Sequence, residues 1–230
     1  MTTGLQDLTI GITESFDVVD KTACLGMPAY PFRVAEATGA FVYSKVMICG
    51  GYSDGISTPT GQCYSLGPNE TTWKPNGNLI TPRQAAASVV MNDKLVIFGG
   101  YNAAGYILST EEMDEAGKAT LGPSMPLTTK HHCAVKINHN TALIIGGADE
   151  SVSIKFTYFY DFDGKTFKSG PDLMVARERH ACGMLSSNGK SFVVVTGGKN
   201  GGVILGSTEY MALDDLTTWH QGLEVLTRQP

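Results

Sequence analysis

Basic residues that recur along the chain have the clearest capacity for recognition chemistry. Arg83 and Arg177 each stand in a short turn, Lys130 stands in a third, and Arg179 closely follows Arg177. A guanidinium group donates two parallel hydrogen bonds to a carboxylate, so several such residues on one surface favour an acidic ligand. An arginine can also anchor its own turn through backbone carbonyls, and for any single one of them this structural role is equally open.

The five cysteines allow a different chemistry, because paired thiols form disulfides. Cys49 ends one expected strand, and Cys63 lies in the next strand of the same sheet. Adjacent antiparallel strands bring side chains to about 5 Å, so these thiols either form a disulfide or stay buried and free. Cys133 and Cys182 occupy corresponding first-strand positions, and we expect both to be small core residues. Cys24 is the odd one out, and no Cys-x-x-Cys pair indicates a zinc or redox site.

Histidines and carboxylates are the remaining candidates for catalysis or metal binding. His132 and His180 open equivalent strands and could approach each other, and two imidazoles with one carboxylate would suffice for a metal. These histidines are either structural or metal ligands, and we predict no metal, no cofactor and no catalytic residue. Glu36, Glu178 and Arg179 could form an acid/base pair, but nothing in their spacing specifies catalysis. Neither a phosphate-binding Gly-x-x-x-x-Gly-Lys loop nor a Gly-x-Ser-x-Gly nucleophile motif is present.

These residues are positioned by short strands that recur with a period of about 50 residues. The stretch 84–101 shows the pattern: two apolar strands flank a turn at Asn92-Asp93, and the pair Gly99-Gly100 ends the second strand. Glycine pairs follow a strand at three further places, Gly50-Gly51, Gly146-Gly147 and Gly197-Gly198. A third strand and a large apolar residue come after each pair. Each repeat therefore predicts four antiparallel strands, and radially stacked four-stranded units form a β-propeller.

The recurring residues resemble kelch repeats. The resemblance rests on the glycine pairs, on Trp73 and Trp219 about 20 residues after them, and on turns of the type Arg83-Gln84-Ala85-Ala86 and Arg177-Glu178-Arg179-His180. It extends from about Glu14 to the C-terminus, although Leu121 and Phe167 stand where the family prefers tryptophan. It implies an all-β fold, a β-propeller of four-stranded antiparallel blades in one domain, 1–230. The expected units are a partial blade at 1–33 and full repeats at about 34–83, 84–130, 131–177 and 178–228.

The first expected unit has only half of its strands. Segments 15–19 and 23–25 match the third and outer strands of a repeat, and the first two strands of that unit are missing. Kelch rings close by joining strands from both termini in one blade, which hides the edge strands. Four full repeats with a partial one therefore predict an incomplete propeller, either a fragment or a divergent short form.

Composition narrows the range of partners. Seventeen basic against twenty-two acidic residues give a net charge of −5 without a long basic run, which disfavours nucleic acid. No apolar run reaches the roughly 18–20 residues of a membrane-spanning helix, and no signal peptide is recognisable. The triplet Asn69-Glu70-Thr71 is a glycosylation sequon in an expected loop. Together with the Cys49–Cys63 pair it favours an extracellular location, with a cytoplasmic one as the alternative.

The expected blade geometry gathers the basic residues on one face. Because successive strands of a blade run in opposite directions, the loop after each glycine pair and the turn leading to the next blade emerge on the same face. Kelch domains that capture acidic peptides use this face, so the resemblance implies an aromatic and cationic platform. The candidate partner-binding residues are Arg33, Tyr52, Arg83, Tyr101, Lys130, Arg177 and Arg179.

We therefore predict a non-catalytic protein–protein interaction module that presents these loops to a protein or peptide partner, which could be acidic. The alternative is a carbohydrate-acting kelch-type enzyme or lectin, mutarotase-like or oxidase-like, with its site at the central channel.

Overall fold

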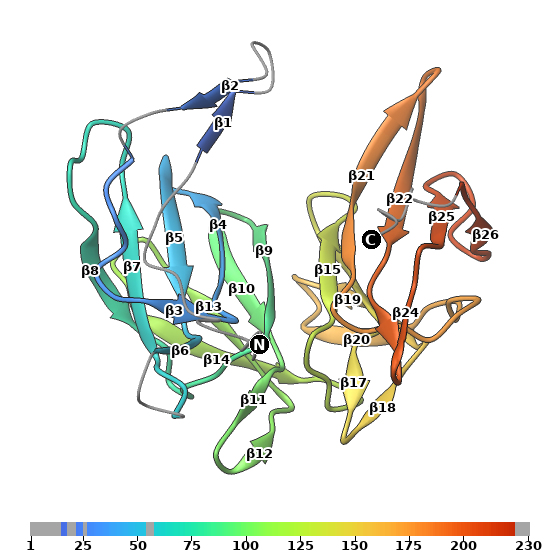
Figure 1. Cartoon of the computed structure of the whole chain (residues 1–230), viewed down its shortest axis with the longest axis horizontal. Coiled ribbons are helices and arrows are strands. Elements are labelled where there is room, and N and C mark those ends of the chain that lie inside the picture. Colours follow the sequence, from blue (N-terminus) through green and yellow to red (C-terminus); the bar gives the residue numbers. More distant parts are fainter. Residues whose placement is uncertain (1–14, 18–21, 25–26, 54–57, 224–230) are drawn as a thin grey trace, which may run out of the picture.

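Four four-stranded antiparallel sheets make up most of the structure (Figure 1). The computed structural model describes residues 15–17, 22–24, 27–53 and 58–223 of the 230-residue chain. Blade 1 contains β4 (Thr38–Val42), β5 (Lys45–Cys49), β7 (Gln62–Leu66) and β8 (Lys74–Asn78). Blade 2 contains β9 (Ala87–Met91), β10 (Lys94–Phe98), β13 (Ser109–Met113) and β14 (Ala119–Ser124). Blade 3 contains β15 (Cys133–Lys136), β16 (Thr141–Ile145), β19 (Thr157–Asp161) and β20 (Thr166–Ser169). Blade 4 contains β21 (Ala181–Ser187), β22 (Lys190–Thr196), β25 (Thr208–Ala212) and β26 (His220–Gln221).

Short two-stranded elements accompany the blades. After each glycine pair the chain forms β6 (Tyr52–Ser53), β11 (Tyr101–Asn102), β17 (Ala148–Asp149) or β23 (Lys199–Asn200). The last three pair with β12 (Gly105–Tyr106), β18 (Val152–Ser153) and β24 (Val203–Ile204), and β6 pairs with β3 (Val34–Ala35). At the N-terminal side, β1 (Ser15–Asp17) and β2 (Thr22–Cys24) form an antiparallel pair at the predicted third and outer strand positions.

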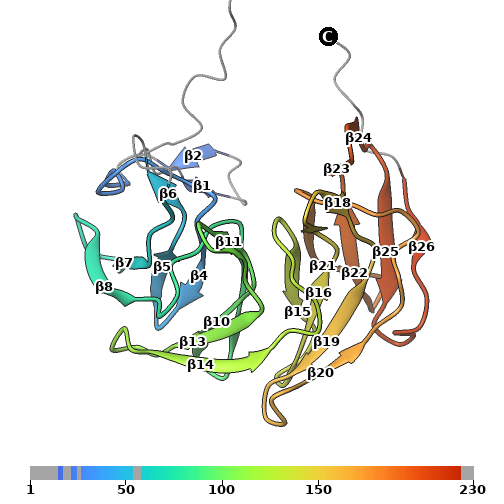
Figure 2. The same ribbon diagram turned by 90° about the horizontal axis from the view of Figure 1, so that it is seen from below.

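The blades follow one another around a common axis in chain order (Figure 2). In each blade the first strand, β4, β9, β15 or β21, lies on the inside, and the last strand lies outermost. This arrangement confirms the expected all-β fold with four-stranded antiparallel blades. Among the described residues there is no helix that is long and apolar enough to cross a membrane.

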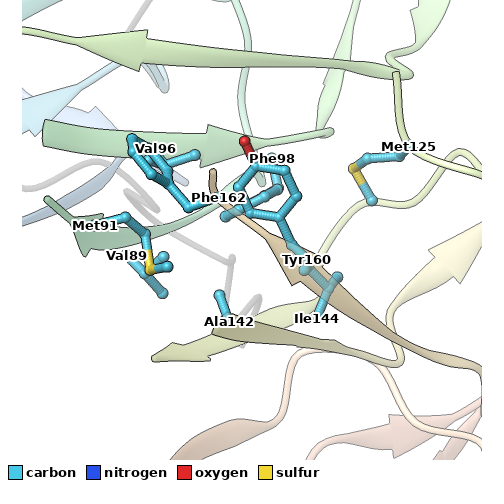
Figure 3. Close-up of a cluster of buried hydrophobic side chains, with 9 residues drawn as sticks. All are labelled: Val89, Met91, Val96, Phe98, Met125, Ala142, Ile144, Tyr160 and Phe162. Carbon is cyan, nitrogen blue, oxygen red and sulfur yellow. The ribbon is translucent and has the colours of Figure 1, made fainter. Parts of the chain in front are cut away.

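Second strands are apolar on both faces because they pack between two neighbouring blades. Leu95 and Ile97 of β10 lie in the cluster shared with blade 1, whereas Val96 and Phe98 lie in the cluster shared with blade 3. Figure 3 shows Phe98 against Tyr160, whose ring centroid is 5.3 Å away. Successive residues of a strand point to opposite faces, so an unbroken apolar run is what a doubly covered strand requires.

The glycine pairs are structural, as the sequence predicted. Gly99 and Gly100 have φ values of +56° and +97°, which side chains other than glycine rarely adopt. A Cβ atom on Gly100 would lie 2.6 Å from the carbonyl oxygen of Gln84. Glycine is therefore needed where the end of the second strand touches the turn that leads into the first strand.

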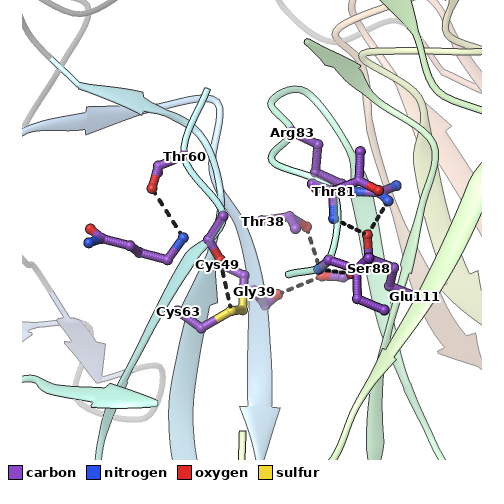
Figure 4. Close-up of a disulfide and its surroundings, with 12 residues drawn as sticks. Thr38, Gly39, Cys49, Thr60, Cys63, Thr81, Arg83, Ser88 and Glu111 are labelled. Carbon is purple, nitrogen blue, oxygen red and sulfur yellow. Dashed lines mark hydrogen bonds and ion pairs between the residues drawn. A yellow bond between two sulfur atoms is a disulfide. The ribbon is translucent and has the colours of Figure 1, made fainter. Parts of the chain in front are cut away.

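Two disulfides join strands, and the sequence had left one of them open as an alternative to buried free thiols. Cys49 and Cys63 lie opposite each other on β5 and β7 and are bonded, with 4.1 Å between their Cα atoms (Figure 4). Cys133 of β15 is bonded to Cys182 of β21, with 6.0 Å between their Cα atoms. The interpretation of Cys133 and Cys182 as unpaired core residues was therefore wrong. Their bond crosses from blade 3 to blade 4.

Candidate functional site

One residue from each blade forms a ring around the propeller axis. Glu36, Ala85, His131 and Arg179 all have φ values of +54° or +55°, although none is glycine. The N–H of Ala85 donates to the carbonyl of Glu36, that of His131 to Ala85, and that of Arg179 to His131, at 2.8–2.9 Å. These bonds link the turns before the four first strands. The same backbone geometry in every repeat thus brings side chains from all four blades to one level of the axis.

A pocket of about 280 Å³ opens at this ring and is called the axial pocket here. Its lining consists of the four ring residues and the next residue of each repeat, namely Ala37, Ala86, His132 and His180. The side facing blades 1 and 2 is lined mainly by alanines, and the side facing blades 3 and 4 by histidines and Arg179. The pocket therefore combines a small apolar wall with a polar one.

Glu36 is the centre of the polar contacts in the axial pocket. Its Oε1 lies 2.9 Å from Nε2 of His131 and accepts a hydrogen bond of 3.1 Å from Arg179. Its Oε2 accepts a hydrogen bond of 2.9 Å from the side-chain amide of Gln84. Burial alone would raise the pKa of Glu36, but hydrogen bonds and charges from His131 and Arg179 lower it to about 2. The carboxylate is thus ionised and held by side chains of three other blades.

A second carboxylate extends this network toward the hairpin of blade 4. Glu178 Oε2 lies 3.5 Å from Nδ1 of His131, so that imidazole stands between two carboxylates. Glu178 Oε1 lies 3.5 Å from Nζ of Lys199. Acidic and basic groups therefore alternate from blade 1 across the axis to the β23/β24 hairpin.

His132 and His180 lie in the wall of the pocket and are buried. Neither ring has a nitrogen with a hydrogen-bond partner. The backbone of Phe98 lies near His132, and the backbones of Ile145 and Arg177 lie near His180. Burial lowers the pKa of His132 to about 3 and that of His180 to about 4. Both imidazoles are therefore neutral at pH 7. Among the described residues, no group of three or more histidines, cysteines, aspartates and glutamates could hold a metal ion.

These two histidines predict a loss of stability at mildly acidic pH. In the unfolded chain each imidazole takes up a proton near pH 6.5, whereas in the folded protein it resists protonation down to about pH 4 for His180 and about pH 3 for His132. Stability is therefore lost as the pH falls below 6.5. Between pH 7 and pH 5 each histidine should lower the free energy of unfolding by about 2 kcal/mol.

Urea unfolding at pH 7 and pH 5 measures this effect. His132→Ala and His180→Ala should each reduce the pH dependence by about half, and the fold accepts alanine there because Ala37 and Ala86 occupy the same position in blades 1 and 2. His139→Ala, which alters an exposed loop histidine, is the control and should leave the dependence unchanged. An equal pH dependence in wild type and both pocket variants would contradict the prediction.

The leading turns and the segments after the glycine pairs do meet on one face. Gln84 pairs with Tyr101, Lys130 with Ala148, and Glu178 with Lys199 through isolated β-bridges. In blade 1 the same contact is made by Ala35 and Tyr52. The Lys130 ammonium lies 4.7 Å from the centroid of the Tyr101 ring and 5.1 Å from that of Tyr106. The predicted aromatic and cationic residues Tyr52, Tyr101, Lys130 and Arg179 therefore lie on the face that surrounds the axial pocket.

Arg83 and Arg177 do not lie on that face, and their assignment as partner contacts was wrong. Arg83 is buried and donates to Gly99 O and Ser109 O, and its guanidinium forms an ion pair of 2.5 Å with Glu111 (Figure 4). Glu111 also accepts hydrogen bonds from the backbone N–H groups of Ile80 and Thr81. The pair thus fastens the linker from blade 1 to the third strand of blade 2.

Arg177 has the same role in blade 4. It donates to the carbonyls of Gly197 and Ser207 and forms an ion pair of 2.7 Å with Glu209. Glu209 accepts hydrogen bonds from the backbone N–H groups of Met174 and Val175. The structural alternative stated for single arginines therefore holds for both Arg83 and Arg177.

Arg33 is displaced by one residue from the position that the repeat alignment gave it. Because Ala35 pairs with Tyr52 as Gln84 pairs with Tyr101, the residue equivalent to Arg83 is Val34. Val34 packs against the aromatic cluster of blade 1, and Arg33 is exposed just before it. Asn69 of the sequon is exposed in the turn between β7 and β8, so its glycosylation stays a prediction.

The sequence did not reveal Glu36, Gln84 and His131 as one cluster. Each comes from a different repeat, and the turn motif that contains Gln84 does not show which residues of the other repeats it meets. Correct alignment of the leading turn in blade 1 would have placed Glu36 in register with His131 and Arg179. That alignment is obscured because blade 1 has Val34 where blades 2 and 4 have Arg83 and Arg177.

Comparison with known proteins identifies the architecture only. No family model matches the chain, and no curated protein is similar to it in sequence. Among the solved structures that resemble it is one titled "Structure of YjhT", with a TM-score of 0.75 and 13% sequence identity. That alignment covers 89% of this chain and 74% of the other. The fold is that of a β-propeller. Function follows from the residues of a site and not from a shared fold, so the axial pocket has to be judged by its own chemistry.

Proposed function

We propose that the face around the axial pocket binds a protein or peptide partner, and that the chain is a non-catalytic interaction module of the kelch type. The observation that carries this proposal is the convergence of four leading turns and four post-glycine segments around a pocket at which Arg179 is exposed. The small sheets β3/β6, β11/β12 and β17/β18 lie toward the lower side of Figure 1. A scaffold of rigid blades with variable loops at one end is a common basis for binding.

The side chains of this face suit a protein partner. Arg179, with half of its side chain exposed, stands at the centre, and Lys130 and Tyr101 stand at the rim. The hairpin residues Val152 and Ile204 expose 67% and 75% of their surface. Arginine and aromatic residues are enriched at protein interfaces.

The size of the axial pocket also favours a side chain over a larger ligand. Its volume of about 280 Å³ is at the lower limit of small-molecule sites, which span roughly 300–1,000 Å³. One acidic side chain reaching from a partner would fit in such a space. Arg179 would then bind the carboxylate, and the rim residues would contact the partner's neighbouring residues.

A panel of labelled acidic, basic and neutral peptides, measured by fluorescence anisotropy, tests the proposal. Acidic peptides should bind, and Arg179→Glu and Lys130→Glu should each weaken binding about tenfold or more. Lys168→Glu is the matched control, because Lys168 is exposed on the outermost strand β20 and should not affect binding. Equal peptide affinities of all three variants and the wild type would contradict the proposal that this face binds the partner.

The competing proposal is a carbohydrate-acting enzyme or lectin at the same pocket. It draws support from the neutral imidazoles of His132 and His180, which can exchange hydrogen bonds with hydroxyl groups. A sugar panel distinguishes the two proposals. Saturable binding of a sugar that is lost in His132→Ala, with no binding of any peptide, would favour the competing proposal.

A further inference from the structure

We propose that the axial pocket is a carboxylate-binding site that the chain's own Glu36 occupies, and that a ligand carboxylate binds by displacing Glu36. The inference deepens the proposed function, because it names the chemical group that this face recognises. The Glu36 side chain stands in for the ligand, and the residues around it define the site.

The contacts of Glu36 are those that a bound carboxylate would make. Both of its oxygens are engaged, one by His131 and Arg179 and the other by Gln84. The partners come from three other blades, and the most distant, Arg179, is 143 positions away in sequence. A guanidinium, an imidazole and an amide that converge on one carboxylate form a set of directed polar groups and not a single surface ion pair.

Arg179 has further capacity for a ligand. Only one of its terminal nitrogens contacts Glu36, and half of its side chain is exposed. A guanidinium has five N–H donors, so Arg179 retains donors that point to no residue described in the structure. An incoming carboxylate can therefore begin to bind to Arg179 before Glu36 has left.

The pocket also contains polar groups that Glu36 does not satisfy. The ring nitrogens of His132 and His180 are buried in its wall and lack hydrogen-bond partners. Buried polar groups are normally paired, and groups left unpaired at a pocket indicate a place for a ligand or for water. A ligand with a hydroxyl or amide next to its carboxylate would satisfy these rings, which Glu36 cannot.

The Glu36 side chain can be removed without straining the backbone. Its φ of +55° is a conformation that glycine adopts readily, so Glu36→Gly deletes the carboxylate and relieves the backbone at the same time. The variant leaves the Arg179, His131 and Gln84 groups without their acceptor. If these groups form a carboxylate site, free acetate should bind in place of the missing side chain.

Thermal unfolding of the full chain in sodium acetate and in sodium chloride, at equal ionic strength and pH 7, is the test. At about ten times its dissociation constant, acetate should raise the unfolding midpoint of Glu36→Gly by about 3–6 °C over chloride. The wild type should show no such difference, and Glu36→Gly/Arg179→Gln should lose it. Equal midpoints of Glu36→Gly in the two salts, or an equal acetate effect in all three proteins, would overturn the proposal. If Glu36→Gly does not fold in chloride, recovery of folded protein on refolding in acetate or chloride replaces the midpoint, with equal recovery as the contradicting result.

Acidic peptides form the second arm, which separates a free carboxylate ligand from a carboxylate on a protein. If the partner is a protein, Glu36→Gly should bind an acidic peptide about tenfold more tightly than the wild type, because the internal competitor is gone. Rescue by acetate without any peptide binding would retain the site and reject the proposed function. If peptide binding depends on Arg179 but acetate does not stabilise Glu36→Gly, the proposed function stands. Only the proposal that Glu36 occupies the carboxylate site would then be rejected.

Discussion

Replacement of Arg177 by methionine should lower the free energy of unfolding by about 3–5 kcal/mol, because it leaves Glu209 buried without its counter-charge. The side chains of Arg177 and Glu209 are 0% and 2% exposed, and the guanidinium also binds two backbone carbonyls. Glu209 in turn holds the backbone N–H groups of Met174 and Val175, which belong to the linker from blade 3. Loss of the arginine thus weakens the junction between two blades.

Urea unfolding at pH 7 measures this loss, and two further variants identify its cause. Arg179→Met makes the same chemical change at an exposed position two residues later and should cost no more than about 1 kcal/mol. Arg177→Met/Glu209→Met removes both charges and should recover much of the stability, since an apolar pair can replace a buried ion pair. Similar losses for Arg177→Met and Arg179→Met would contradict the buried anchor.

Blade 3 provides a natural comparison for the same pair. Thr129 stands where blades 2 and 4 have arginine, and its hydroxyl donates to Gly146 O as the arginines donate to Gly99 O and Gly197 O. In the strand register, Tyr158 lies opposite Ile144 as Glu111 lies opposite Ile97. The arginine and the glutamate are therefore present together in blades 2 and 4, and both are absent from blade 3, as expected for a structural pair.

The fold could be predicted from the sequence because its signals are local and repeated. The strands around Asn92-Asp93, the glycine pair and the next strand occur within each repeat, and four copies reinforce the interpretation. Burial of Arg83 and Arg177 could also have been predicted from the sequence. Ser109-Thr110-Glu111 and Ser207-Thr208-Glu209 occur in the two repeats that have the arginine, and each glutamate is the partner of that arginine.

The axial pocket could not be predicted in the same way. Glu36, His131 and Arg179 meet only because the leading turns of three blades share one backbone geometry around the axis. A misalignment of one residue in blade 1 put Arg33 in the place of Val34, so Glu36, although named as a candidate with Glu178 and Arg179, was not aligned with His131 and Arg179. Contacts between repeats depend on such offsets, which a pattern within one repeat does not fix.

The disulfide between Cys133 and Cys182 depends on an offset of the same kind. Cys133 lies opposite Ile145, directly before the glycine pair of blade 3, whereas Cys182 lies opposite Val195, one residue further from the glycines of blade 4. The two cysteines are therefore not at corresponding positions. Since neighbouring residues of a strand face opposite ways, this offset turns Cys133 toward blade 4 and Cys182 toward blade 3. Cysteines at equal positions would both have faced the same way around the ring and could not have bonded.

Removal of this disulfide should have the second large effect on stability. It closes a loop of 49 positions, for which the chain-entropy relation gives about 4 kcal/mol, against about 3 kcal/mol for the 14 positions between Cys49 and Cys63. Cys133→Ala/Cys182→Ala should therefore lower the free energy of unfolding by more than Cys49→Ala/Cys63→Ala does.

Urea unfolding of both double variants and of the wild type, with and without reductant, tests this order. Reductant should lower the free energy of unfolding most in the wild type, which loses both disulfides. In Cys133→Ala/Cys182→Ala it should lower that free energy only by the contribution of the Cys49–Cys63 disulfide. Cys133 follows His132 directly, and its disulfide joins the two blades that supply His131, His132, His180 and Arg179 to the axial pocket. Loss of the disulfide should therefore also lower the affinity of the axial pocket for any ligand. A reductant effect that is the same in Cys133→Ala/Cys182→Ala and in the wild type would show that blades 3 and 4 are not joined by this bond.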